Sequence, residues 1–491
     1  MYHSKDLLLI VTRISGKMFQ PINHDTPFGS SASHSTPINK LPIETLTEIF
    51  KIYATSYPEV LDQRVVDLCL VGKHWNAVAN CTPQLWTKIN LSFPFAHRDL
   101  AVAQKRVHAS KLEKIDVSID FRGPDWDGYE PPSDEVTDES VWVRDIKAVL
   151  RGTEKRWRSI KVVSETWLPF YKLMGVWKFT HLPSLGSISM EWANRVFGMQ
   201  NIPFDPQALV GPMSLFGRNA SLPSLAELSL SAVHVDWDEA SVGCQNLRKL
   251  KITNQTYDVG PSFEQFAAML SSSPRIEHLD VSGFCPEHHT GPLSLAGEAP
   301  DIPVAHLPML KEFIFGWKDA DLGCPFLQMF QIGNSLESLT LLDTESGLGH
   351  WGDPQTGGRR WVQDSRRVFE ALRELGSTAQ GVRDEVPPGP FISMRRVKKL
   401  RIVWTKTGWL APLLETMEEL EDIWLEDVSK EVLKAVSSVG SGRATAGRPL
   451  ESLDLRWTWR KEIPRHAVRP ILELKKAGTK VHAQGVGGRE I

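Results

Sequence analysis

A recurring spacing of apolar residues, apolar-x-x-apolar-x-apolar, constrains the fold of this chain more than any other feature. Its last two apolar positions lie two residues apart, as on one face of a β-strand, and its first lies at the turn into that strand. Eleven ordered matches form the candidate repeat, at Leu112/Ile115/Val117, Trp157/Ile160/Val162, Leu185/Ile188/Met190, Leu225/Leu228/Leu230, Leu247/Leu250/Ile252, Ile276/Leu279/Val281, Leu310/Phe313/Phe315, Leu336/Leu339/Leu341, Val397/Leu400/Ile402, Leu420/Ile423/Leu425 and Leu450/Leu453/Leu455.

One such unit cannot bury its own apolar face, so stacked units must share a continuous core. Helical patterns lie between the units, for example at residues 263–270, 362–375 and 432–436. Alternating strands and helices favour a parallel sheet with right-handed connections. We therefore predict an α/β fold in which residues 94–480 form an irregular leucine-rich-repeat-like solenoid. The alternative is a globular α/β domain whose matches to the spacing arose by chance.

Four other segments do not follow the repeat. Residues 1–38 lack periodicity, and we predict that they are disordered. The acidic segment at 120–140 and the Gly-rich segment at 346–360 are predicted to be surface loops that interrupt the solenoid. Near the C-terminus, residues 470–477 are predicted to form a short helix that caps the solenoid, and residues 481–491 a tail.

Residues 39–93 have helical rather than repeat periodicity and predict a bundle of three short helices. The stripes of the first two helices are Leu46, Ile49, Phe50 and Tyr53, then Leu68, Val71, Trp75 and Val78. Thr82 is the candidate N-cap of the third helix, with Pro83 at its first position. Leu41 is a poor cap before Pro42, which favours a role in a contact; packing on its own bundle would explain it equally.

The amino-acid sequence of this region resembles F-box-like domains, especially those of filamentous, mushroom-forming fungi. The matching segments are LPIETLTEIF at 41–50, LCLVGKHWNAVA at 68–79 and TPQLWTKI at 82–89, whereas the first loop, at 56–66, is longer than in the shortest members. The resemblance implies docking onto the Skp-family adaptor of a cullin–RING ubiquitin ligase. The contact residues that it implies, some of which would instead be bundle core, are Leu41, Pro42, Ile49, Leu70, Val71 and Trp86.

Composition narrows the class of partner and the compartment. The formal net charge is −3 over 491 residues, which argues against a general nucleic-acid or membrane-surface role. Five scattered cysteines without a CxxC pair fit a reducing compartment and no disulfide framework. The apolar run at 7–11 is too short for a signal peptide or a membrane span. We therefore expect the cytoplasm, the nucleus or both.

No pattern predicts catalysis, a cofactor or a metal site. Cys285, His288 and His289 lack a fourth zinc ligand at proper spacing and are better explained as loop surface. Nothing pairs two carboxylates for acid–base work, and the Gly-rich tail lacks the strand and helix of a phosphate loop. The basic run at 395–401 contains repeat core positions, so its charges fit a solvated face better than a nuclear-import or nucleic-acid signal.

Target binding is predicted on the C-terminal part of the concave face. Alternation turns the residue between the last two apolar positions outward, together with the one that follows. In the middle units these residues are small or polar; in the later units the candidates are Ile314, Leu342, Val403, Trp424 and Arg456. Trp317, Trp404 and Trp457 are expected to rim this surface. A loop folded over the patch, or a register shifted by one residue, would bury it instead.

Two functions are consistent with these patterns, and neither is enzymatic. The first is a substrate-recruiting subunit of a Skp–cullin–F-box type ubiquitin ligase, whose N-terminal bundle binds the Skp-family adaptor and whose solenoid binds the target. The second is a leucine-rich-repeat scaffold without a role in ubiquitin transfer.

Overall fold

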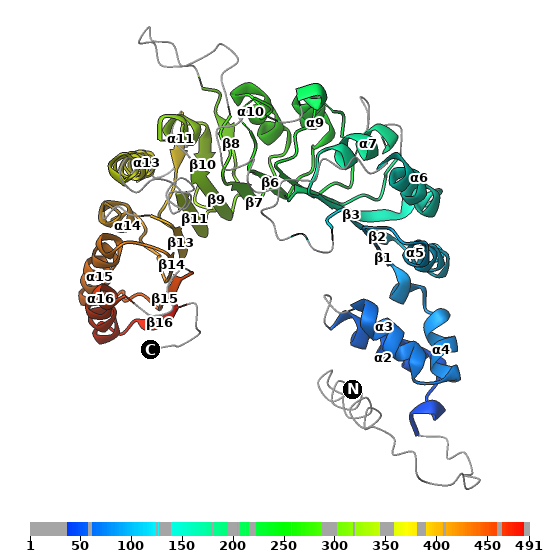
Figure 1. The fold of residues 1–491 in the computed structure, drawn as a ribbon. Helices are drawn as coiled ribbons and strands as arrows, with labels where there is room; N and C mark the ends of the chain where they lie inside the picture. The colour runs from blue at the N-terminus through cyan, green and yellow to red at the C-terminus, as the bar shows by residue number, and fades with distance from the viewer. Residues whose placement is uncertain are drawn as a thin grey trace. The chain divides into compact units, whose positions relative to one another are not determined.

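The computed structural model describes residues 37–56, 61–123, 126, 139–177, 181–193, 204, 207–211, 213–215, 222–256, 258–286, 302–317, 320–343, 358–380, 389–405, 409–458 and 464–485. Of the lead-in predicted to be disordered (1–38), residues 1–36 lie outside the described residues, and residues 37–38 begin a 3-10 helix. Of the two predicted loops, residues 124–125, 127–138 and 346–357 lie outside the described residues, whereas 139–140 and 358–360 belong to helices. The chain divides into two compact units (Figure 1): unit 1 comprises residues 1–120 and 144–160, and unit 2 comprises residues 121–143 and 161–491.

Unit 1 begins with short helices where the stripes predict them: η1 (Pro37–Lys40), α2 (Ile43–Thr55), α3 (Leu61–Leu70), α4 (Lys73–Asn80) and η3 (Pro83–Trp86). Two details of the prediction are wrong. The second stripe is divided between α3 and α4, because Gly72 occupies the N-cap position of α4 with an extended backbone. The third element is a single 3-10 turn, and the Thr82 hydroxyl donates to the Val78 carbonyl instead of capping it.

The remainder of unit 1 carries two parallel strands, β1 (Lys88–Ser92) and β2 (Ile115–Asp120), joined by α5 (His97–Ala109). β1 was missed although Trp86, Ile89 and Leu91 have the full repeat spacing, because residues 39–93 were assigned to the helical bundle. Ile89 and Leu91 are buried. Leu112 was expected in the core but is 92% exposed, because Lys111 turns with a φ of 51° before the strand begins. α6 (Glu139–Leu150) and β3 (Trp157–Ser164) cross the boundary between the units, and η4 is Glu154–Arg156.

Unit 2 repeats one strand and one return segment along the chain. Its sheet strands are all parallel, in the order β4-β5-β6-β7-β9-β11-β13-β14-β15-β16. Their bounds are β4 (Ser187–Trp192), β5 (Glu227–Ser231), β6 (Lys249–Thr253), β7 (His278–Val281), β9 (Glu312–Trp317), β11 (Ser338–Asp343), β13 (Lys399–Val403), β14 (Asp422–Glu426), β15 (Ser452–Trp457) and β16 (Lys480–Gly485).

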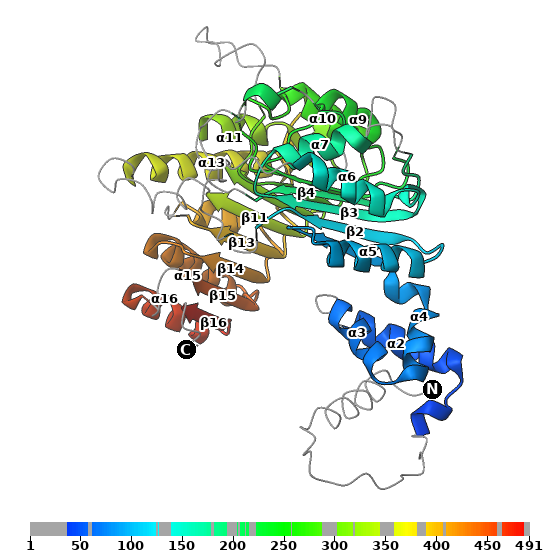
Figure 2. The same ribbon diagram turned by 45° about the vertical axis from the view of Figure 1, so that its right-hand side comes forward.

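The return segments contain the helices α7 (Leu168–Trp177), α9 (Trp237–Gly243), α10 (Phe263–Ser272), α11 (Ala320–Leu327), α13 (Gly358–Gln380), α14 (Ala411–Glu415), α15 (Lys430–Thr445) and α16 (Arg465–Lys476), and the 3-10 turn η5 (Gln207–Leu209). A second, three-stranded parallel sheet joins β8 (Ala305–His306), β10 (Phe330–Ile332) and β12 (Phe391–Ile392) in the order β12-β10-β8. Figures 1 and 2 show the helices of unit 2 on its outer side and the long sheet on its inner, concave side.

The repeat spacing identifies the core correctly from Trp157 onward, since each of its apolar positions is at most 3% exposed. Helix starts are also locally encoded. Ser262 and Gln265 form a reciprocal capping box at the start of α10, and Ser429 caps α15. These caps satisfy backbone N–H groups that a first helical turn leaves without partners.

The C-terminal prediction needs correction at two points. The last helix, α16, begins at Arg465 and contains Pro470 in its interior, whereas the pattern placed its start at Pro470. Residues expected to form a tail from 481 belong to β16, which pairs with β15 from Lys480 to Gly485. The strand was missed because only Val481 and Ala483 supply its buried side.

Candidate interaction surfaces

The bundle of unit 1 has one apolar core, and the predicted stripes largely build it. Phe50 and Trp75 pack with ring centroids 5.0 Å apart, and the indole nitrogen of Trp86 donates to the Ala79 carbonyl at 2.8 Å. The buried members are Leu46, Ile49, Phe50, Ala54, Val65, Leu68, Trp75, Val78, Ala79, Leu85 and Trp86. A small core of this kind needs few side chains, which leaves other apolar residues outside it.

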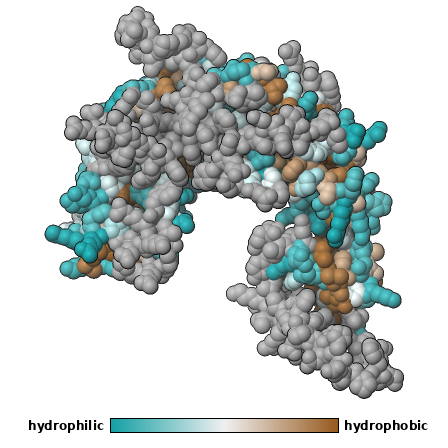
Figure 3. All heavy atoms as spheres, viewed as in Figure 1, coloured by the Kyte–Doolittle hydropathy of each residue, from teal (hydrophilic) through white to brown (hydrophobic). Residues whose placement is uncertain are grey.

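Among the described residues of the bundle, three large hydrophobic side chains are exposed: Leu70 at 75%, together with Ile43 and Val66. Val66 and Leu70 are four residues apart and therefore share one face of α3. Arg64, near the start of α3, donates to the carbonyl of Tyr53, near the end of α2, at 2.6 Å. This contact joins the end of α2 to the start of α3. Figure 3 shows hydrophobic residues on the visible face of this bundle.

The six residues that the resemblance implies as contacts do not share one environment. Leu70 and Pro42 are exposed, whereas Leu41 and Val71 are partly buried against the bundle core. Ile49 and Trp86 are core residues, so neither presents its side chain as a surface contact in this structure. Periodicity alone did not separate the two roles, because both kinds of residue recur on the same helices. It also missed Ile43 and Val66, which lie outside the apolar stripes.

The concave face of unit 2 consists of rows of side chains aligned by the parallel register. The central row runs through Ser189, Ser229, Lys251, Asp280, Ile314, Thr340, Arg401, Trp424, Asp454 and His482. Its first members are small or charged, and the bulky Ile314 and Trp424 occur only in the later strands. The expected change in character toward the C-terminal part is therefore present in the structure.

Charges on this face are paired mostly between neighbouring strands. On this face Lys251 contacts Asp280 at 3.2 Å, and directly ahead of the strands Glu277 lies 2.8 Å from Lys311 and 3.8 Å from Arg248. The hydrogen bond and charge of Lys311 lower the pKa of the Glu277 carboxyl. Cross-strand pairs of opposite charge stabilise a sheet and leave little net field along the middle of the face.

Trp424 and Arg401 form the most distinctive pair among the later strands. Trp424 is 39% exposed, and the Arg401 guanidinium lies 5.2 Å from the centroid of its ring. Arg401 also donates to Glu426 at 2.8 Å, which holds its guanidinium over the indole. An indole fixed in this way offers a rigid, largely apolar contact at little entropic cost.

The five predicted target-binding residues are not equally available. Trp424 and Arg456 are exposed, and Ile314 and Leu342 are half-buried. Val403 is 2% exposed, so its assignment to an outward surface is wrong. It is the last residue of β13, in register with Leu342 and Glu426 on the neighbouring strands, and the chain turns directly after it at Trp404, whose φ is 63°.

The expected rim of tryptophans is also wrong for two of its three members. Trp317 and Trp457 are buried because β9 and β15 extend to these residues, which makes each the third inward side chain of its strand. Trp404 is half-buried after β13. The repeat spacing marks only the first two inward residues of β9 and β15, so it gives no sign that each strand continues to its tryptophan.

The sequence also singled out a Cys/His group near Cys285 and a basic run at 395–401. No three His, Cys, Asp or Glu side chains among them are placed to hold a metal ion. Cys285 donates from its thiol to the Leu322 carbonyl at 3.2 Å, while His288 and His289 lie outside the described residues. In the basic run at 395–401, Val397 and Leu400 are buried and the charged side chains are exposed, as predicted.

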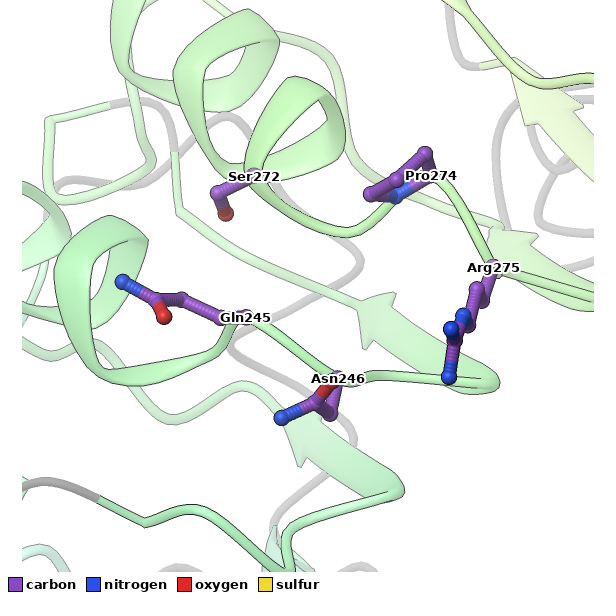
Figure 4. Close-up of a pocket in the computed structure, with 5 residues that line it drawn as sticks. All are labelled: Gln245, Asn246, Ser272, Pro274 and Arg275. Carbon is purple, nitrogen blue, oxygen red and sulfur yellow. The ribbon is translucent and has the colours of Figure 1, made fainter.

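A pocket opens beside the turns that lead into β6 and β7 (Figure 4), lined by Gln245, Asn246, Ser272, Pro274 and Arg275. Its polar groups also serve the local structure, since Asn246 donates to the Pro223 carbonyl and the Ser272 hydroxyl to the Met269 carbonyl. Arg275 is the one charged residue of this lining.

Comparison with known proteins does not assign this chain to a family. No protein-family model matches the sequence, and no curated protein matches it. Among solved structures, the leucine-rich repeat-containing protein LegL7 from Legionella pneumophila is similar at 13% sequence identity, covering 63% of this chain and 86% of that chain, with a TM-score of 0.27. A similarity of this size carries no argument about fold or function. In the described part of the chain, no helix combines the length and apolarity that crossing a membrane requires.

Proposed function

We propose that the protein is a substrate-recruiting subunit of a Skp–cullin–F-box type ubiquitin ligase, in which the unit 1 bundle binds a Skp-family adaptor and the unit 2 face binds the target. The main support is Leu70, which is 75% exposed on a bundle whose core is already filled. A large apolar side chain left in water beside other exposed apolar residues is typical of a protein contact. The resemblance of residues 41–89 to an F-box indicates that this partner is a Skp-family adaptor.

Leu70→Asp is the sharpest test of adaptor binding. The side chain is exposed, so the change leaves the bundle core intact while placing a charge in the proposed contact. We expect a loss of about 2 kcal/mol or more, roughly 30-fold in Kd, for a purified Skp-family adaptor measured by calorimetry. Leu112→Asp is the matched control, since Leu112 is another exposed leucine of unit 1 outside the bundle. Wild-type affinity in a folded Leu70→Asp variant would contradict the proposal.

Leu41→Ala with Pro42→Ala tests the neighbouring part of the same surface. Because Leu41 also packs on the bundle core, circular dichroism of the double variant has to accompany the binding measurement. A folded double variant with full adaptor affinity would remove these two residues from the contact.

A leucine-rich-repeat scaffold without a role in ubiquitin transfer is the second candidate, and the long concave sheet of unit 2 supports it independently of unit 1. The two functions predict different proteins in a pull-down from a cell lysate. Recovery of a Skp-family adaptor and a cullin, lost in Leu70→Asp, supports the ligase subunit. Partners recovered without either protein, and retained in Leu70→Asp, favour the scaffold.

A further inference from the structure

Among the described residues, β16 is the last strand of the unit 2 sheet and has an open edge. β16 pairs with β15 on one side, and no other strand among the described residues pairs with its opposite side. The Lys480 N–H donates to Glu451 O just ahead of β15. Alternation along the strand therefore directs the N–H and C=O groups of Val481 and Ala483 to the opposite edge. An edge of this kind is a template for a further strand.

The helix next to this edge presents apolar side chains on its outer flank. Glu473 of α16 accepts a hydrogen bond from Ser437 of α15 at 3.0 Å, which fixes the flank that faces α15. Ala467, Ile471 and Leu474 face the core and are buried. At 100° per residue, Val468 and Leu472 project from the flank turned away from α15, and both are exposed. Figure 3 shows a small hydrophobic area among hydrophilic residues where α15 and α16 lie.

The charges around this edge are basic. Arg465, Lys476 and Lys480 are exposed. The acid of α16, Glu473, is already engaged by Arg469 at 3.0 Å and by Ser437. A second copy of the chain brought edge to edge would place basic groups against basic groups, which opposes association. The charge pattern favours an acidic occupant instead.

We propose that the open edge of β16 binds an extended acidic segment of a partner protein by strand addition. Main-chain hydrogen bonds to Val481 and Ala483 hold the segment, and its alternate side chains face the two sides of the sheet. Side chains on the helix side contact Val468 and Leu472 and are apolar. Side chains on the concave side lie near Lys480 and are acidic. This edge is distinct from the candidate target-binding surface around Trp424, and the proposal does not depend on a role in a ubiquitin ligase.

The test is a selection of random nonapeptides displayed on phage against the full-length protein, followed by binding measurements with the enriched peptides. We expect enrichment of sequences that alternate acidic and apolar residues. Binding should fall about tenfold or more in Lys476→Glu with Lys480→Glu and in Val468→Ser with Leu472→Ser. The matched control is Lys399→Glu with Lys434→Glu, which changes two exposed lysines of unit 2 away from the edge and should retain binding.

Three results would overturn the proposal. The first is a selection that yields no alternating acidic and apolar sequences. The second is enriched peptides that bind the two edge variants as tightly as the wild type. The third is a dimeric full-length protein that becomes monomeric in Val468→Ser with Leu472→Ser, since a second copy would then occupy the edge. Circular dichroism of each variant establishes that lost binding does not reflect unfolding.

Discussion

Acid should destabilise unit 2 through one buried histidine. The His234 ring is stacked on Trp167, with centroids 4.3 Å apart and an interplanar angle of 11°, and packs edge-on to Phe204 at 4.4 Å. Burial lowers the pKa of His234 from 6.5 to about 4, although the Gly211 backbone and the Asp258 carboxylate oppose the shift. A neutral imidazole is thus part of this aromatic cluster.

The sign and size of the effect follow from the two pKa values. The unfolded chain binds a proton at His234 below about pH 6.5, whereas the folded chain does so only near pH 4, so stability is lost as the pH falls through this window. The full difference corresponds to roughly 3 kcal/mol, of which about 2 kcal/mol is lost between about pH 7.5 and pH 5.

Urea unfolding of the wild type and of His234→Phe at a series of pH values measures this contribution. Phenylalanine retains an aromatic ring beside Trp167 and removes the titrating group. We expect the wild type to lose about 2 kcal/mol more than the variant between about pH 7.5 and pH 5. His74→Phe, which changes an exposed histidine of unit 1, should keep the wild-type slope. Identical slopes for the wild type and His234→Phe would refute the reasoning.

Three further predictions concern packing, target binding and chemistry. Gly316→Ala should cost about 1–3 kcal/mol of stability in urea unfolding, because the new Cβ would lie 2.9 Å from the Ser282 Cα, whereas Gly175→Ala, with open space around it in α7, should stabilise by about 0.5–1 kcal/mol. Trp424→Ala with Arg456→Ala should abolish target capture in a pull-down and leave adaptor binding unchanged; persistent capture would exclude the C-terminal concave face. Replacing all five cysteines with alanine should leave ubiquitin transfer intact in a reconstituted ligase, because such an adaptor acts by proximity. Burial also raises the pKa of the Cys244 thiol to about 12, which disfavours its nucleophilic thiolate form. Lost transfer with binding retained would contradict a non-enzymatic role.

The sequence predicts the repeat core well because strand alternation and burial depend on the same apolar residues. Phe313 and Phe315, for example, are both inward and fully buried, as their spacing requires. Strands at the two ends are harder to find. Trp86, Ile89 and Leu91 around β1 fit the repeat spacing but adjoin a helical bundle, and β16 buries two side chains without the preceding apolar residue. The edge strand β16, to which the acidic segment is proposed to bind, therefore could not be predicted from the repeat spacing.

Surface residues are less predictable because exposure depends on where each strand and helix ends. Residues with a positive φ directly follow several strands, at Ala232, Asn254, Trp404 and Asp427. Of these four residue types, only asparagine and aspartate favour the left-handed backbone conformation. A tryptophan such as Trp404 gives no local signal that the chain turns there, so the burial of Val403 beside it could not be anticipated. The same reasoning applies to the bundle, where Ile49 and Leu70 fit the same F-box-like pattern but only the packing of α2 on α3 sends one inward and the other into solvent. Candidate contacts are therefore better chosen from exposed apolar side chains, here Ile43, Val66 and Leu70, than from the pattern alone.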